Sequence, residues 1–137
     1  MSRRKGRILA FQALYSYDVG NVNRESLMNF DWVEQKTLKK IGEDGKIFAQ
    51  LLVSGTIEHL DEIDEKIKAN IEKWDFERIN KVDLALLRMS VYSLMYQKDM
   101  HPSIVIDEAI DISKEFGVDD AYKFINAVLD SIRKSLL

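Results

Sequence analysis

Four cations gather at the start of the chain, where Arg3, Arg4, Lys5 and Arg7 fall in a segment, residues 1–17, that contains no acid. The other 120 residues carry 16 bases and all 23 acids, so a local charge of +4 adjoins a body whose charges sum to −7. A basic segment on an acidic body is typical of a protein that meets a polyanion, and it predicts contacts with nucleic-acid phosphates. The alternative is that these charges only keep the N-terminus soluble.

An amphipathic helix from about Arg3 to Tyr17 is expected to present these cations. Its apolar residues recur at steps of three and four: Ile8, Phe11, Leu14 and Tyr15. Gln12 lies seven residues after Lys5 and therefore shares an outward side with it. Cations that track phosphates and flat side chains that stack on bases hold single-stranded RNA. The Gln12 amide can hydrogen-bond a base edge, whereas the Tyr15 ring can either stack on a base or complete the core.

The sequence lacks the groups of residues that an enzyme active site would need. The chain has no cysteine, and its two histidines, His59 and His101, are too isolated to form a ligand set. No phosphate-cradling or nucleophile motif is present. The acids of segment 61–65 are typical of a solvated helix face, and Asp107 and Glu108 diverge by about 100° on a helix, so they cannot share a site. We therefore predict no catalytic residue, no metal and no cofactor.

The elements that must position the cations are helices, because the sequence has only one proline and six glycines. After a turn at Gly20-Asn21, the pattern predicts a short helix near 25–30, a loop around 42–45, a long helix over 46–74, a central buried helix over 82–96, and two more helices near 105–116 and 120–136. Asn80 should cap the central helix, and Gly55 should kink its helix or admit a close neighbour. Gly117 should end the helix near 105–116. The fold class is all-α: one compact bundle of about six to seven helices over residues 1–137.

No segment contains the uninterrupted run of roughly 20 apolar residues that a membrane span needs. Charges and Gln12 interrupt the stretch after the basic start, and no small-residue cleavage site follows it, so a signal peptide is not expected.

Four blocks of sequence, in the same order from end to end, resemble the NusB family of bacterial antitermination factors. They are RRKGR with FQALYS (3–7 and 11–16), VDLALLRM (82–89), IDEAIDISKEFG (106–117) and KFINAVLD (123–130). Two positions depart from the family pattern. Asn126-Ala127 stands where many members have Asn-Gly, which puts in doubt any role of a flexible glycine there, and Asp107-Glu108 stands where Asn-Glu is common.

The resemblance implies a cytoplasmic helical protein that binds the boxA element of nascent RNA together with NusE, which is also a protein of the small ribosomal subunit. The pair helps RNA polymerase to read through terminators, notably in ribosomal RNA transcription. Lys123 and Phe124 match family positions that approach RNA, although Phe124 is equally suited to the core. Asp120 beside them should tune RNA binding down or cap the last helix.

The family's partner surface lies on helices of the second half, and this makes Asp83, Arg88 and Tyr92 candidates for contacting NusE. For Arg88 the alternative is an internal pair with an acid such as Asp83, Asp107 or Glu108, since a charge in an apolar helix is usually paired.

Two other functions remain open from the sequence. The same helical domain occurs fused ahead of ribosomal RNA cytosine methyltransferases, where it binds RNA for the catalytic part. Because no nucleotide-binding βαβ segment follows Leu137, we expect a freestanding protein. The second alternative is a self-associating helical module, such as a homodimer that covers its own RNA surface.

Overall fold

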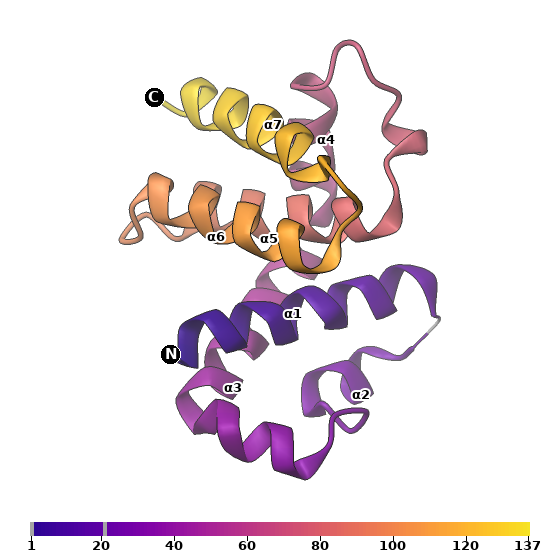
Figure 1. The fold of residues 1–137 in the computed structure, drawn as a ribbon, viewed down its shortest axis with the longest axis vertical. Helices are drawn as coiled ribbons and strands as arrows, with labels where there is room; N and C mark the ends of the chain where they lie inside the picture. The colour runs from indigo at the N-terminus through magenta and orange to yellow at the C-terminus, as the bar shows by residue number, and fades with distance from the viewer. Residues whose placement is uncertain (1, 21) are drawn as a thin grey trace.

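Seven α-helices and one 3-10 turn make up the regular structure of the described residues, 2–20 and 22–137, in this computed structural model (Figure 1). They are α1 (Ser2–Val19), α2 (Arg24–Asn29), α3 (Gln35–Glu58), α4 (Leu60–Ala69), η1 (Phe76–Arg78), α5 (Lys81–Tyr96), α6 (Pro102–Phe116) and α7 (Ala121–Ser135). The all-α fold class and the expected number of helices are confirmed. The predicted turn at Gly20-Asn21 includes Asn21, which lies outside the described residues. None of the described helices is long and apolar enough to cross a membrane.

The helices form two groups that meet along α1 and α5. Helices α1, α2 and α3 make up one end of the molecule, and α4 to α7 the other (Figure 1). The central helix α5 packs against α1, α3, α4, α6 and α7, and eleven of its residues are buried, as its almost continuous apolar sequence predicts. Each fully buried aliphatic side chain contributes roughly 1.5–3 kcal/mol, so α5 is the main source of core stability.

Asn80 caps α5 as predicted. Its Oδ1 accepts a hydrogen bond from the Asp83 backbone N–H at 2.9 Å, and its Nδ2 donates to Asp83 Oδ2 at 3.0 Å. The cap satisfies one of the free N–H groups at the helix start. At the far end of the fold, Asp120 precedes α7 with φ 65° but makes no side-chain cap bond, whereas Gly117 follows α6 in an extended conformation.

The loop expected around residues 42–45 is correct only at Gly42, where the helix is interrupted, because residues 43–45 are helical parts of α3. Gly42 alone departs from helical geometry, with φ 82°, and it kinks the helix. Gly45 is buried and its carbonyl oxygen lies 2.8 Å from where a Cβ on Gly6 would stand. Gly6 and Gly45 therefore allow α1 and α3 to cross closely, and Gly42 provides backbone freedom at the kink. In the sequence, glycines at a close helix crossing cannot be distinguished from glycines in a loop.

We expect Gly6→Ala to lower the free energy of unfolding by about 1–3 kcal/mol, because the new methyl group must push α1 away from the α3 backbone. Urea denaturation measures the loss. The neighbouring exposed residue provides the control: Lys5→Ala should stay within about 0.5 kcal/mol of the unmodified chain. Equal stabilities of the two variants would show that the crossing has room for a side chain.

The single helix predicted over 46–74 is also wrong, since α3 ends at Glu58 and α4 at Ala69. His59 lies between them with φ −113° and ψ 22°, and its ring stacks on Tyr96 of α5 at 4.2 Å between centroids. The apolar stripe carries on across this break, because Ile63, Ile67 and Ile71 all reach the core. Periodicity therefore could not reveal the change of direction. Of the two roles expected for Gly55, the structure shows the close neighbour: a Cβ at this position would collide with the Tyr92 ring.

Candidate nucleic-acid interface

The first two turns of α1 hold the four cations, and they point to different sides. Arg3 and Lys5 are exposed, the Arg4 side chain is 37 % exposed, and that of Arg7 only 6 %. Each residue advances about 100° around a helix. Arg7 is therefore a neighbour on the helix surface of Arg3, four residues before it, and of Arg4, three residues before it. Of the four cations, Arg3 and Lys5 are exposed to solvent, Arg4 is partly exposed, and Arg7 is buried.

Arg7 differs from the expectation, because it is buried between α1, α3 and α6. Its Nη1 lies 3.6 Å from Glu108 Oε1, its Nη2 donates to Met100 Sδ at 2.8 Å, and its guanidinium lies over the Phe48 ring. Burial lowers the pKa of Arg7 from its ordinary value; Glu108 opposes this shift, and the positive charges of Arg3 and Arg4 add to it. Arg7 thus anchors the start of α1 to α6, and its charge meets Glu108 and not the solvent.

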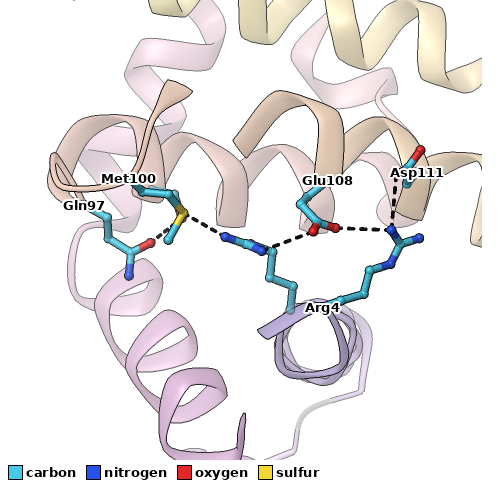
Figure 2. Close-up of polar contacts among 7 residues, drawn as sticks. Arg4, Gln97, Met100, Glu108 and Asp111 are labelled. Carbon is cyan, nitrogen blue, oxygen red and sulfur yellow. Dashed lines mark hydrogen bonds and ion pairs between the residues drawn. The ribbon is translucent and has the colours of Figure 1, made fainter. Parts of the chain in front are cut away.

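Arg4 lies between two carboxylates of α6 (Figure 2). Its Nη1 is 3.4 Å from Glu108 Oε2 and 3.2 Å from Asp111 Oδ2. Glu108 therefore contacts both Arg4 and Arg7 and ties two successive turns of α1 to one position of α6.

Phe48 of α3 supports Arg3, whose guanidinium carbon lies 5.0 Å from the ring centroid. A contact of this kind is worth about 0.5–1 kcal/mol at an exposed site, and it keeps the Arg3 charge at the surface while its stem is held. Phe48 could not be identified from the sequence, because an aromatic residue in a helix is usually a core residue and no local signal separates the two cases.

Gln12 and Tyr15 line a cavity of about 230 Å³ between α1, α5 and α6, together with Phe11, Ser16, Val82 and Phe116. Tyr15 is 37 % exposed and Phe116 38 %, so both rings present a face to solvent. Tyr15 therefore lies at the surface and outside the core cluster, which leaves it available for stacking on a base.

Lys123, Phe124 and Asp120 line a second cavity, of about 820 Å³, at the start of α7. Trp74 lines it too; it is 52 % exposed and meets the Phe124 ring edge to face at 5.2 Å between centroids. Lys123 Nζ lies 3.7 Å from Asp120 Oδ1, so the acid partly neutralises the base, as the expectation of weakened binding requires. Trp74 was not identified from the sequence as a surface aromatic residue, because it falls within the single helix predicted over 46–74.

The family model named NusB matches residues 4–134. The chain belongs to the NusB family. Among its relatives, the transcription antitermination protein NusB of Treponema denticola is 53 % identical over 133 residues, which cover 97 % of this chain and 96 % of the relative. The NusB of Treponema pallidum strain Nichols is 47 % identical over 135 residues, with 98 % and 94 % covered.

Solved NusB structures have the same fold. The NusB of T. maritima aligns with a TM-score of 0.83 at 32 % identity, covering 96 % of this chain and 90 % of that one. The crystal structure of the antitermination factors NusB and NusE in complex with double-stranded RNA aligns with a TM-score of 0.86 at 30 % identity, with 98 % and 97 % covered. The family resemblance of the four sequence blocks is thus confirmed.

The three residues that the NusB resemblance offered as partner contacts do not form one exposed patch. Tyr92 is buried over Gly55. Arg88 makes internal ion pairs, as the alternative interpretation of this residue predicted, but with acids other than those expected. Its Nε and Nη2 donate to Asp64 at 2.9 and 2.8 Å, and its Nη1 lies 3.7 Å from Asp18. Spacing along the chain could not reveal these acids, because they lie on α4 and α1.

Asp83 is the one of the three that reaches a cavity, the larger of the two described above. It is buried, and its Oδ1 has no hydrogen-bond partner among the described residues. Burial raises the pKa of Asp83, and the hydrogen bond from Asn80 opposes this rise. The unpartnered oxygen is buried, so Asp83 forms part of the cavity wall and does not present a free acceptor at the surface.

We expect Arg7→Ala to lower the free energy of unfolding by about 2 kcal/mol, since it leaves the half-buried Glu108 with fewer partners and opens space against Phe48. Urea denaturation measures this loss, and Arg3→Ala, at an exposed position of the same helix, is the control. A loss as small as that of the control would mean that Arg7 is not an anchor.

Proposed function

We propose that this NusB-family chain is an RNA-binding transcription antitermination factor that acts with NusE and performs no catalytic step. One observation carries the proposal: exposed cations begin α1 in a chain that is 53 % identical, over almost its whole length, to a transcription antitermination protein. The solved complex of NusB and NusE with RNA, at a TM-score of 0.86, supports the pairing with NusE. Action in the cytoplasm, in the RNA polymerase antitermination complex, follows from this function.

The path of the RNA follows from the surface chemistry. Arg3, Lys5 and the exposed part of Arg4 meet phosphates of a boxA-like strand. Bases then stack on the Tyr15 ring and on the Trp74–Phe124 pair, and the Gln12 amide reads a base edge. Residues near the start of α5 line both cavities: Val82 lines the smaller and Asp83 the larger.

NusE is needed because this set of contacts is small. Three or four neutralised phosphates give a moderate affinity, and a second protein adds contacts and raises the effective concentration of the strand. Asp83 is the proposed contact with NusE, since it is the one of the three candidate residues that lines the larger cavity.

An RNA titration with and without NusE tests the proposal. Fluorescence anisotropy would follow a labelled boxA-like single strand, a scrambled strand of equal length, and the boxA-like sequence in double-stranded form. We expect tighter binding of the boxA-like single strand than of the scrambled strand, and a further gain when NusE is added. Equal binding of all three RNAs under both conditions would contradict sequence-dependent recognition, and no binding of any of them would contradict the function itself.

A further inference from the structure

Among the described residues, Arg4 is the partly exposed cation of the α1 start that pairs with acids. Its Nη1 lies within 3.4 Å of one carboxylate and 3.2 Å of another, both from α6 (Figure 2). A phosphate oxygen of RNA would bind the same guanidinium by the same charge-assisted hydrogen bonds that a carboxylate makes. Both acids contact Nη1, so a strand that approaches this end of the Arg4 guanidinium competes with an internal acid.

The two acids hold Arg4 in different ways. The Glu108 side chain is 22 % exposed and also pairs with the buried Arg7, so it belongs to the fixed anchor between α1 and α6. The Asp111 side chain is 53 % exposed, and Arg4 is its one ion-pair partner in the described part of the chain. When Arg4 leaves, Asp111 can return to water at little cost, whereas Glu108 cannot.

We propose that Asp111 competes with RNA phosphate for Arg4, and that this competition sets the affinity and the salt dependence of RNA binding. The proposal rests on the function proposed above. As a strand docks on Arg3 and Lys5, the Arg4 guanidinium keeps its contact with Glu108 and exchanges Asp111 for a phosphate oxygen. Asp111 is thus a residue that limits affinity without touching the RNA, and Glu108 keeps the Arg4 stem in place during the exchange.

The expected size of the effect follows from the exposure of the pair. Exposed ion pairs are weak, so removing the competing carboxylate should tighten RNA binding about two- to fivefold. Because Arg4 then neutralises a phosphate without first giving up an acid, the slope of log affinity against log salt should become steeper by up to about 0.7 for a single strand.

Asp111→Asn tests the inference, and Asp107→Asn is its matched control. Asp107 is an exposed acid on the same helix, and it makes no ion pair or hydrogen bond among the described residues. Both variants remove one negative charge near the site, but only Asp111→Asn releases Arg4. Binding of the boxA-like strand is measured by anisotropy over a range of salt, with thermal unfolding midpoints to verify that both variants fold as the unmodified chain does.

We expect Asp111→Asn to bind RNA two- to fivefold more tightly than Asp107→Asn at low salt, by the estimate above. The same two variants are then compared in an Arg4→Ala background, where the difference between them should vanish, since the group for which Asp111 competes is gone. Equal affinities of the two variants with Arg4 present, or a difference that persists in Arg4→Ala, would overturn the inference and leave the proposed function intact. Absence of RNA binding by the unmodified chain, with and without NusE, would overturn both.

Discussion

The double variant Arg3→Ala/Lys5→Ala should bind a boxA-like single strand about 10- to 30-fold more weakly than the unmodified chain at about 0.1 M salt. Both side chains are exposed, and neither makes an ion pair with an acid among the described residues, so their charges are available to phosphates. Each lost phosphate contact should also make the salt slope shallower by about 0.7, from an expected value of about −2 to −3. Anisotropy titrations at several salt concentrations measure both quantities.

Lys36→Ala/Lys39→Ala is the matched control, because it removes two exposed positive charges from the part of α3 before the kink at Gly42, whereas the start of α1 contacts Gly45 and Phe48 after the kink. We expect this variant to lose less than about threefold in RNA affinity, since only long-range attraction changes, and salt screens it. Similar losses in the two double variants would mean that the protein attracts RNA by its overall charge and not by a site at the α1 start. Both variants change surface residues, so their unfolding free energies should stay within about 1 kcal/mol of the unmodified chain.

Arg88→Ala should lower the free energy of unfolding by about 3–5 kcal/mol, because it leaves two carboxylates without their shared cation in a mostly buried place. The Arg88 side chain is 12 % exposed and its bidentate partner Asp64 17 %. Asp18, at 21 %, keeps only Lys81 at 3.4 Å. The ion pairs of Arg88 with Asp18 and Asp64 join α5 to α1 and α4, so their loss loosens the contact between the two groups of helices. Urea denaturation measures the change.

A double-mutant cycle shows whether this loss comes from the unpaired acid. Asp64→Ala added to Arg88→Ala should restore part of the stability, since it removes the carboxylate that Arg88 leaves behind. Lys68→Ala is the control for an exposed pair, with Glu65 at 3.8 Å, and should cost less than about 1 kcal/mol. If Arg88→Ala cost as little as this control, Arg88 would be free to serve a partner protein, as the family resemblance first suggested.

Local sequence signals predicted the fold well wherever the deciding interactions lie within a few residues. The Asn80 cap and the buried helix that follows it depend on neighbours three to four residues away and on an apolar surface all round, and both were confirmed. The break at His59 and the continuous passage of α3 through Gly45 depend instead on Tyr96 and on Gly6, which lie far along the chain. The apolar periodicity is the same with and without the break, so only the packing could reveal it.

The chemistry of the candidate site could be read from composition, and its geometry could not. Four cations without an acid among the first 17 residues determine that the start of the chain is strongly positive, whatever its fold. Which of them meets solvent depends on Phe48, Met100, Glu108 and Asp111, which come from α3, the segment before α6, and α6 itself. Tertiary packing alone brought these groups to α1. A buried guanidinium must find an acid, and this requirement made Arg7 an anchor, whereas Arg3 and Lys5 remain exposed to solvent.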